Sequence, residues 1–410
     1  MSRQTFVIAG ASLAGAKAAQ ELREHGFDGR VVLIGTEPER PYERPPLTKD
    51  YLRGESERDK AYVHAADFYE KHDIELMTST TVTAIDPGGS RVTLDGDREL
   101  SYDRLLLTTG SEPRPITVPG AELDGIYYMR SLADCDVLRR RLDDSGRVAV
   151  VGAGWIGSEF AASARSLGLE VTVIDPLALP NERIFGAEIG GFYRDVHVQH
   201  GVEMLLGQGV GAFEGDGTVA RVRTSAGKVV ECDFAVIGIG ITPRTGLASD
   251  AGLAAENGVV TNDRLETSAP GIFAAGDVAS AWHPFYDHHI RVEHWANALN
   301  QGPAAARAML GEDVSFDRIP YFFSDQYDVG MEYSGYATSW DQVVFRGERD
   351  GGEFIAFWLT DGRVVGGMNV NVWDVNQHVQ ELIRSRRPVD VAALTDPDTP
   401  LDGLVSETTA

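Results

Sequence analysis

One pattern occurs twice in this chain and constrains its fold more than any other feature. In each copy an apolar segment ends in a glycine-rich turn, an alanine-rich stretch follows, and a second apolar segment ends in an acid. The first copy runs from Val7 to Gly15 with its acid at Glu37, and the second runs from Val150 to Gly157 with its acid at Asp175. Strand, turn, helix, strand and acid in this order predict a βαβ unit, so we expect two such units.

The glycine turns indicate that each unit binds a dinucleotide. Glycine lets backbone N–H groups approach a pyrophosphate, the helix N-terminus adds partial positive charge, and the acid accepts from a ribose hydroxyl. A lone turn of this kind can reflect helix packing alone, but two copies in the same context favour ligand binding. The predicted contacts are Gly10, Ser12, Leu13, Ala14, Gly15 and Glu37 in the first unit, and Gly152, Gly154, Trp155, Ile156, Gly157 and Asp175 in the second.

The two copies differ at two informative positions. Ser12 stands where the backbone approaches the phosphates most closely, and its small side chain carries a hydroxyl that can itself donate to phosphate. Asp175 has no basic residue after it until Arg183. An unpaired carboxylate favours a free 2′-hydroxyl and repels a 2′-phosphate, so the second unit is expected to prefer NADH over NADPH. The alternative is that Asp175 is only a surface acid.

The composition excludes several classes of protein. With 43% apolar and 24% charged residues, the chain is globular rather than disordered, and 410 residues suggest two or three domains. A net charge of −25 argues against non-specific binding to nucleic acid or anionic membrane. No apolar run approaches the length of a membrane span, and the chain begins directly with a strand rather than a charged leader. We therefore expect a cytoplasmic protein.

Further segments extend the fold prediction. The strands predicted inside the two units are Arg91–Leu94, Asp103–Gly110 and Phe234–Gly240. Strands that alternate with helices predict open, mostly parallel sheets. From about Ser315 the pattern changes to short alternating strands at 343–346 and 354–358, followed by an amphipathic helix near 375–384. These features predict a separate C-terminal α+β domain, and the last dozen residues are expected to form a solvated tail.

Three more motifs carry a family resemblance. An apolar strand within 267–277 ends in Gly276 and Asp277, where an Asp can accept from a ribityl hydroxyl of a flavin, and 106–110 and 239–244 read as crossover strands. Together with the two turns, these segments resemble the two-dinucleotide-binding flavoprotein superfamily. The resemblance implies FAD in the first unit and NAD(P)H in the second. It also implies an α/β fold with an FAD-binding domain at 1–115 and 245–314, an inserted NADH-binding domain at 116–244, and a C-terminal interface domain at 315–410.

Cysteine usage narrows the family. The disulfide reductases of this superfamily need a redox cysteine pair after the first acid, whereas this chain has Arg-Pro-Pro-Leu-Thr-Lys at 44–49 and only Cys135 and Cys232 elsewhere. Electrons must therefore pass from the flavin directly to an external acceptor. The segments 44–49, 292–298 and 323–328 resemble the NADH-dependent ferredoxin reductases that feed bacterial oxygenases, of the putidaredoxin reductase and biphenyl dioxygenase reductase type. Apoptosis-inducing factor is a more distant relative.

This resemblance implies roles for individual residues. Lys49 is expected beside the flavin ring, paired with Glu159, where its charge would raise the flavin potential; the alternative is a surface lysine on a turn. Trp155 is expected either to cover the nicotinamide face of the flavin or to pack in the core, and Phe323 stands where many relatives have a tryptophan against the flavin. The other implied FAD contacts are Arg44, Val82, Thr109, Gly110, Arg130, Gly276, Asp277 and Trp295, and the other implied NAD contacts are Gly238, Gly240 and Glu293.

The sequence thus predicts an FAD-containing, NADH-dependent ferredoxin reductase that passes single electrons to an acidic, transiently bound iron–sulfur ferredoxin and, indirectly, to an oxygenase. The alternatives are a rubredoxin reductase, a general NADH:acceptor oxidoreductase, or a redox-dependent binding flavoprotein like apoptosis-inducing factor. The basic runs 139–141 and 384–387 are candidate docking sites, the second preferred. No metal is expected at His283, His288, His289 and His294, whose spacing matches no standard site. Whether the protein is a monomer or a dimer stays open.

Overall fold

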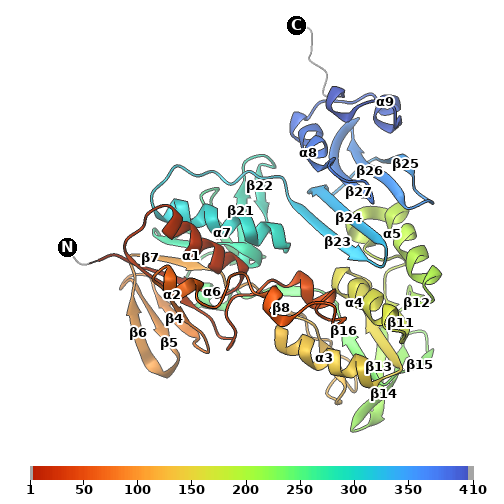
Figure 1. Ribbon diagram of the computed structural model, residues 1–410, viewed down its shortest axis with the longest axis horizontal. Coiled ribbons are helices and arrows are strands. Elements are labelled where there is room, and N and C mark those ends of the chain that lie inside the picture. Colours follow the sequence, from red (N-terminus) through yellow and green to blue (C-terminus); the bar gives the residue numbers. More distant parts are fainter. Residues whose placement is uncertain (1–2, 405–410) are drawn as a thin grey trace. The chain divides into compact units, whose positions relative to one another are not determined.

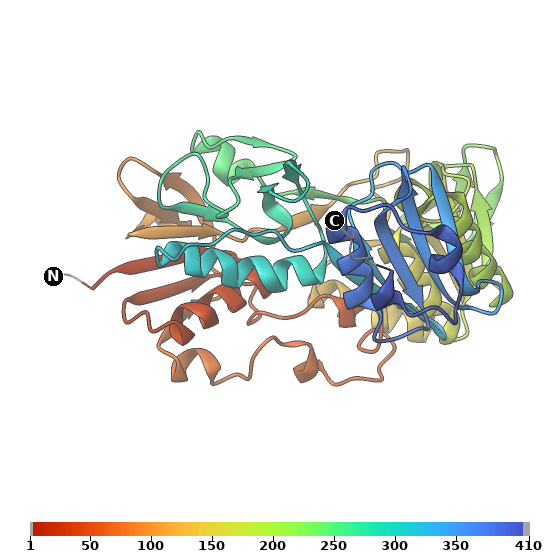
Figure 2. The same cartoon turned by 90° about the horizontal axis from the view of Figure 1, so that it is seen from above.

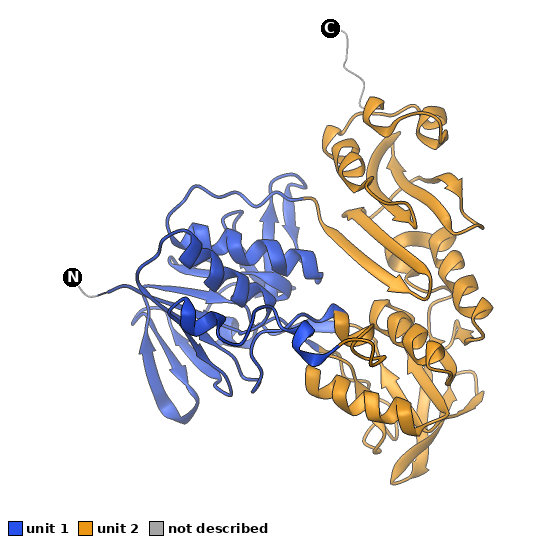
Figure 3. Cartoon of the chain, viewed as in Figure 1, with its two compact units in different colours: residues 1–45, 57–112, 241–318 blue, residues 46–56, 113–240, 319–410 orange. Residues whose placement is uncertain are grey.

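The computed structural model describes residues 3–404, which form two compact units (Figures 1 and 3). Unit 1 comprises residues 1–45, 57–112 and 241–318, and unit 2 comprises residues 46–56, 113–240 and 319–410. Most of the segments 116–244 and 315–410, predicted as separate domains, falls in unit 2, and only residues 241–244 and 315–318 of them belong to unit 1. Short strands β8 (Ser111–Pro113) and β17 (Ile241–Pro243) occur where the chain passes from one unit to the other.

Unit 1 is built on a five-stranded parallel sheet with the order β20-β7-β1-β2-β3. Its central strands are runs of apolar residues without alternation, as expected where both faces of a parallel sheet are covered. The strands are β1 (Thr5–Ala9), β2 (Arg30–Ile34), β3 (Ile74–Met77), β7 (Arg104–Leu107) and β20 (Ile272–Ala274).

Helices α1 (Leu13–Glu24) and α7 (Trp295–Met309) lie side by side on this sheet (Figures 1 and 2). Their close approach depends on Gly302, because a Cβ there would overlap the carbonyl of Ala14. Buried alanines from both helices join one core cluster with strand residues such as Phe6 and Ile8. Small residues thus bring the start of α1 and the body of α7 together.

Smaller elements complete unit 1. They are an antiparallel sheet of β4 (Val82–Asp86), β5 (Arg91–Leu94) and β6 (Arg98–Ser101), helices α2 (Phe68–Lys71) and α6 (Gly246–Asp250), and a sheet of β18 (Ala255–Glu256), β19 (Gly258–Thr261), β21 (Ala279–His283) and β22 (His288–Ile290). The histidines His283, His288 and His289 lie in strands rather than in a loop. These residues form the hairpin β21–β22, in which Ala281 pairs with Ile290 and Asp287 turns the chain with φ +58°.

Unit 2 repeats the parallel sheet, with the order β12-β11-β10-β16-β9. Its strands are β9 (Ile126–Tyr128), β10 (Arg147–Val151), β11 (Glu170–Asp175), β12 (Glu203–Leu206) and β16 (Phe234–Ile237), and its helices are α3 (Leu132–Asp144), α4 (Trp155–Ser166) and α5 (Glu182–Gln199). A three-stranded antiparallel sheet follows, formed by β13 (Val210–Asp216), β14 (Thr218–Thr224) and β15 (Val229–Glu231). The predicted internal repeat is therefore confirmed, with β10, α4 and β11 corresponding to β1, α1 and β2.

The C-terminal part of unit 2 is a five-stranded antiparallel sheet with the order β23-β24-β27-β26-β25. It consists of β23 (Tyr321–Gln326), β24 (Val329–Gly335), β25 (Gln342–Glu348), β26 (Glu353–Thr360) and β27 (Arg363–Val370), with helices α8 (Asn376–Ser385) and α9 (Val391–Thr395). One face of α5, including Phe185, Ile189 and Tyr193, joins the core of this sheet around Trp358. Helix α5 thus contributes to the core of the C-terminal sheet, whereas strands of the parallel sheet belong to a separate cluster.

The predicted secondary structure of the C-terminal region is confirmed, apart from its end. The strands near 343–346 and 354–358 are β25 and β26, and the helix near 375–384 is α8. Residues 401–403 form a 3-10 turn with Leu401 buried, so the predicted solvated tail is packed at its start. Its remainder, residues 405–410, lies outside the described residues. Between residues 3 and 404 no helix combines the length and apolar character that crossing a membrane requires.

Candidate functional site

The first glycine turn needs glycine for its backbone geometry. Gly10 has φ +127°, and a Cβ there would overlap the carbonyl oxygen of Thr108. A Cβ at Gly15 would in turn overlap the carbonyl oxygen of Gly10. The Thr108 hydroxyl donates to the Gly10 carbonyl at 2.7 Å, which ties the turn to the end of β7. Strand, turn and helix are therefore held together by contacts that tolerate no side chain at either glycine.

The helix that follows this turn offers backbone donors. Ser12 is the N-cap of α1, and its side chain makes no capping hydrogen bond to the helix. The first N–H groups of a helix lack intrahelical acceptors, so those of Leu13, Ala14 and Gly15 can serve an anionic ligand. Gly276 lies close to Ala14, with φ +79° and its N–H donated to Gln301 Oε1 at 2.9 Å. The turn carrying Gly276 and Asp277 thus approaches the start of α1, as a shared ligand would require.

The other contacts predicted for unit 1 come from separate segments of the chain. Glu37 is partly exposed; it accepts from the Tyr42 hydroxyl at 2.5 Å and lies 3.9 Å from Arg44. Trp295 opens α7 and donates its indole N–H to Glu43 at 3.2 Å, and burial raises the pKa of Glu43. Val82 begins β4, the Thr109 hydroxyl donates to the carbonyl of Arg244 at 3.1 Å, Gly110 has φ +66°, and Glu293 pairs with Arg291 at 2.5 Å.

The second glycine turn repeats the geometry of the first. Gly152 has φ +103°, and a Cβ there would overlap the carbonyl oxygen of Gly238. A Cβ at Gly157 would overlap the carbonyl oxygen of Gly152. At Gly154, the N-cap of α4, the nearest atom to a Cβ is 4.0 Å away. Packing within the protein therefore explains Gly152 and Gly157 but leaves open space beside Gly154, on the side where a pyrophosphate would approach.

Asp175 is fixed by the turn that it was predicted to serve. It ends β11 and is 9% exposed, and its carboxylate accepts from the backbone N–H of Ala153 at 2.6 Å and of Leu177 at 2.7 Å. The alternative of a simple surface acid therefore fails. A carboxylate has about four acceptor positions, so two remain for ribose hydroxyls. The second turn therefore keeps acceptor positions toward a bound ligand, on a carboxylate fixed by the backbone.

Trp155 packs into the core rather than standing free. It is the first residue of α4, and its ring lies edge-on to Phe322 at 4.7 Å, to Phe185 at 5.3 Å and to Tyr193 at 6.0 Å between ring centroids. This placement favours the packing role over movement on ligand binding. Ile156 beside it is 39% exposed, and Gly240 has φ +104°. The aromatic contacts connect the second turn to α5 and β23.

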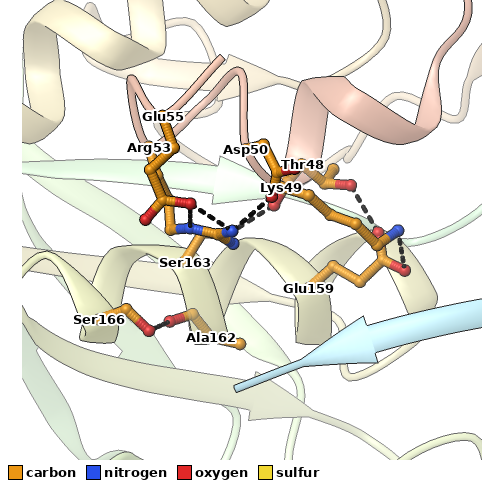
Figure 4. Close-up of polar contacts among 9 residues, drawn as sticks. All are labelled: Thr48, Lys49, Asp50, Arg53, Glu55, Glu159, Ala162, Ser163 and Ser166. Atoms are coloured by element: carbon orange, nitrogen blue, oxygen red, sulfur yellow. Dashed lines mark hydrogen bonds and ion pairs between the residues drawn. The ribbon is translucent and has the colours of Figure 1, made fainter. Parts of the chain in front are cut away.

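Lys49 and Glu159 form a buried ion pair, as predicted. Lys49 Nζ donates to Glu159 Oε1 at 2.8 Å, and the Thr48 hydroxyl donates to Glu159 Oε2 at 2.5 Å (Figure 4). The side chains of Lys49 and Glu159 are 11% and 7% exposed. A buried charge pair persists only where further hydrogen bonds satisfy both partners, and Ser324 supplies one more by donating to Glu159 Oε1 at 2.7 Å. The alternative of a surface lysine on a turn therefore does not hold.

Residues of the segment 46–56 anchor this pair to α4. The hydroxyl of Ser163 donates to the Thr48 carbonyl at 2.6 Å, and Arg53, which pairs with Asp50 at 2.6 Å, donates to the Ser163 hydroxyl at 3.3 Å (Figure 4). Phe323 faces Lys49, whose Nζ is 5.3 Å from the ring centroid. Neither Thr48 nor Ser163 stood out in the sequence, because a hydroxyl carries no signal until its acceptor is known.

The predicted residues divide between the units. Gly10 through Gly15, Glu37, Arg44, Val82, Thr109, Gly110, Gly276, Asp277, Glu293 and Trp295 belong to unit 1, whereas Lys49, Arg130, Gly152 through Gly157, Glu159, Asp175, Gly238 and Gly240 belong to unit 2. Arg130 precedes α3, where its backbone N–H donates to Asp134 at 3.2 Å. Both cysteines are buried thiols in unit 2, and burial raises the pKa of Cys232 to about 12. No group of metal-ligating side chains occurs within residues 3–404.

Comparisons with known proteins agree with this geometry. The family model "Pyridine nucleotide-disulphide oxidoreductase" matches residues 4–302, and the model "Reductase C-terminal" matches residues 321–405. Rhodocoxin reductase of Rhodococcus erythropolis is 34% identical over 96% of this chain and 92% of its own length. The anthranilate 1,2-dioxygenase system ferredoxin–NAD(+) reductase component of Burkholderia cepacia is 37% identical over 99% of this chain and 98% of its own.

Solved structures show the same fold. The reductase in the covalent putidaredoxin reductase–putidaredoxin complex matches with a TM-score of 0.95 and 34% identity, covering 99% of both chains. The ferredoxin reductase for the CYP199A2 system of Rhodopseudomonas palustris matches with a TM-score of 0.95 and 33% identity, covering 98% of this chain and 100% of its own. The chain therefore belongs to the pyridine nucleotide-disulphide oxidoreductase family, as a flavoprotein-type oxidoreductase with a reductase C-terminal domain.

Proposed function

We propose that this protein is an NADH-dependent ferredoxin reductase that holds FAD at the first glycine turn and NADH at the second. It accepts a hydride from NADH and delivers single electrons to an iron–sulfur ferredoxin of an oxygenase system. The bound flavin supplies the exchange between two-electron and one-electron chemistry, and the protein supplies binding, orientation and charge. The observation that carries this proposal is the pair of turns at Gly10 and Gly152, each built so that helix N–H groups remain available for a pyrophosphate.

In this proposal the ion pair of Lys49 and Glu159 sets the charge beside the flavin. Lys49 provides a positive charge beside the flavin that favours electron uptake, and Glu159 holds the lysine in place. The support is that both side chains are buried and that Glu159 accepts from Lys49, Thr48 and Ser324 at once. Hydride transfer itself requires no acid or base from the protein.

The choice of NADH over NADPH rests on Asp175. Its buried carboxylate accepts from two backbone N–H groups, one of them within the turn where NADH is proposed to bind. A 2′-phosphate at this position would lie beside the carboxylate of Asp175, and the two negative charges would repel each other. NADPH is therefore the poorer electron donor in this proposal.

The proposed electron acceptor is a small ferredoxin. The relatives named above include a ferredoxin–NAD(+) reductase component and a reductase solved with putidaredoxin. Of the two basic runs, 139–141 is partly engaged inside unit 2, since Arg139 lies over the ring of Tyr51 and Arg141 donates to Tyr127 at 2.8 Å. We propose the run 384–387 at the end of α8 as the part that attracts an acidic ferredoxin, because three of its four residues are arginines. A cytoplasmic location belongs to the same proposal.

A reduction assay with cytochrome c as the final electron acceptor tests the proposal. We expect rapid reduction with NADH only when a [2Fe–2S] ferredoxin is added, and much slower reduction when NADPH replaces NADH. A rate that is equally fast without ferredoxin would support a general NADH:acceptor oxidoreductase instead. Slow reduction with a long-lived charge-transfer absorption and a change of oligomeric state would support a binding flavoprotein.

A further inference from the structure

A line of hydrogen bonds inside unit 2 connects Glu159 to a buried histidine that no sequence motif marks. Ser324, whose hydroxyl donates to Glu159 Oε1, lies 3.3 Å from the side-chain amide nitrogen of Gln326. The carbonyl oxygen of that amide lies 3.0 Å from Nε2 of His197, and Nδ1 of His197 lies 3.2 Å from the hydroxyl of Tyr327. Ser324, Gln326 and His197 are each at most 1% exposed. Water therefore cannot replace any of these partners.

The chemistry of the groups fixes the direction of the line. The carboxylate of Glu159 only accepts, so the Ser324 hydroxyl donates to it and its oxygen accepts from Gln326. The Gln326 carbonyl then accepts from His197, which requires the neutral tautomer with its proton on Nε2. Nδ1 of His197 is left as an acceptor for the Tyr327 hydroxyl. Every donor in the line therefore points toward Glu159.

The opposite direction has a specific cost. If the Gln326 amide were reversed, its carbonyl oxygen would face Ser324 and would compete with Glu159 for the Ser324 proton. Its NH₂ group would face His197, which would then need its proton on Nδ1. Burial supports the neutral ring in either case, since it lowers the pKa of His197 to about 4. The tautomer of His197 therefore reports whether Ser324 donates to Glu159.

We propose that His197 is a positioning residue for the Lys49–Glu159 pair. Through Gln326 it fixes the orientation of the Ser324 hydroxyl, so that Glu159 keeps a third donor and holds Lys49 in one place. The location also suits this role: His197 is in the last turn of α5, whereas Ser324 and Gln326 are alternate residues of β23 and share one face of that strand. The consequence for the flavin rests on the proposed function, whereas the tautomer does not.

The first test is the tautomer itself. In a ¹⁵N–¹H correlation spectrum of the full chain with ¹⁵N-labelled histidine, assigned with His197→Gln, His197 should show the Nε2–H form at pH 7. It should keep that form when the pH is lowered to 5.5. An Nδ1–H form, or protonation of the His197 ring above pH 5.5, would overturn the proposal. This measurement gives the same answer if the chain takes up no FAD, in which case the proposed function fails and the network is judged separately.

The second test is the reduction potential of bound FAD, measured by equilibration with a reference dye so that NADH binding has no influence. His197→Leu removes the donor to Gln326, and we expect the ratio of reduced to oxidised flavin at a fixed potential to fall about tenfold, which is about 30 mV for a two-electron couple. His197→Gln keeps a donor near the Nε2 position and should restore most of the potential. Gln199→Leu, which replaces an exposed polar residue of the same helix, is the matched control and should leave the potential unchanged.

A double variant separates positioning from a general loss of packing. Ser324→Ala removes the hydroxyl through which His197 is proposed to act, so it should shift the potential by a similar amount. Adding His197→Leu to Ser324→Ala should then shift the potential no further. Additive shifts in the double variant, or equal shifts in His197→Leu and Gln199→Leu, would show that His197 acts only through packing and would overturn the proposal.

Discussion

The two glycine turns have the same backbone geometry but pack against different neighbours. The first turn is held from outside by small residues, with Ala14 against Gly302 of α7 and Gly276 close by. The second is held by a large side chain, since Trp155 extends from its turn into the aromatic cluster with Phe185 and Phe322. Repetition therefore preserves the peptide geometry that faces a pyrophosphate, while the surroundings adapt each copy to its own part of the fold.

The acids that follow the two turns also differ in burial and in their hydrogen-bond partners. Glu37 is partly exposed and contacts two side chains, Tyr42 and Arg44. Asp175 is buried, and both of its oxygens accept from backbone N–H groups, one of them within the turn itself. Asp175 is therefore part of the structure of the second turn, whereas Glu37 is an accessory to the first. Substitutions should separate the two copies accordingly.

The largest expected effect comes from a Cβ at the first glycine of each turn. Gly10→Ala and Gly152→Ala each force alanine into a positive-φ position against a carbonyl oxygen, which costs about 3 kcal/mol or more and lowers ligand affinity about 100-fold. Gly10→Ala should weaken FAD binding and leave NAD⁺ binding within threefold. Gly152→Ala should do the reverse, with yellow protein that NADH reduces slowly.

Equilibrium dialysis with FAD, calorimetry with NAD⁺ and circular dichroism check these variants. Gly26→Ala is the matched control, because Gly26 also has a positive φ but no atom within 4 Å of a Cβ. The proposed difference between the turns would be contradicted if both variants lost affinity for the same ligand. It would also be contradicted if Gly26→Ala lost as much ligand affinity as either variant.

The next effect concerns stability against pH. Burial lowers the pKa of His197 to about 4, below the value of about 6.5 in an unfolded chain. Between these values the unfolded state binds the extra proton, so the free energy of unfolding falls as pH decreases through this window and is unaffected above it. His197 alone accounts for about 3 kcal/mol of this loss.

Urea unfolding of wild type and His197→Gln at pH 7.5 and pH 4.5 measures this contribution. The variant should lose clearly less stability than wild type between the two pH values, whatever its stability at pH 7.5. Burial also lowers the pKa of His64 in unit 1 to about 4, so His64→Gln should change the pH dependence of stability in the same direction. Equal pH dependence of wild type and His197→Gln would contradict a buried neutral His197.

A smaller effect is expected at the acids. Asp175→Ala removes the predicted ribose acceptor together with the bond to Ala153, so kcat/KM for NADH should fall about tenfold and the preference for NADH over NADPH should largely disappear. Glu37→Ala should leave kcat/KM for NADH within threefold and weaken only FAD binding. Steady-state kinetics with both nucleotides decide the matter, and an unchanged preference in Asp175→Ala would remove Asp175 from nucleotide selection.

The smallest effect is expected where the turns differ in sequence. Ser12→Gly and Gly154→Ser exchange the middle residue of each turn, and nothing lies within ordinary contact distance of a Cβ at Gly154. Each ligand affinity should change by less than about threefold. A large loss of FAD in Ser12→Gly would instead show that the Ser12 hydroxyl binds the phosphates, which would sharpen the contrast between the turns.

The sequence predicts the parts of this fold that local pattern determines. Both βαβ units, the strands of the C-terminal sheet and α8 follow from apolar runs, glycine turns and amphipathic spacing. The Lys49–Glu159 pair was also predicted, although through resemblance to known reductases rather than through spacing. Local pattern predicts the units, the strands and α8 because each of them is formed by residues close together in the chain, whereas Lys49 and Glu159 are far apart in it.

Features formed by distant segments could not be predicted in this way. The shared core of α5 and the C-terminal sheet depends on Phe185 and Trp358 meeting across most of the second half of the chain. The line from His197 to Glu159 joins α5, β23 and α4 through side chains that are common and unremarked in any sequence. Trp155 had two possible environments, and only the packed aromatic rings around it decide between them.

The most direct test of the central claim, that two separate turns bind two different dinucleotides and exchange a hydride, is an anaerobic titration of the FAD-loaded protein with NADH. The account predicts one FAD bound per chain and loss of the oxidised flavin absorption at one equivalent of NADH. A chain that binds no FAD, or a bound flavin whose absorption NADH does not change, would contradict it.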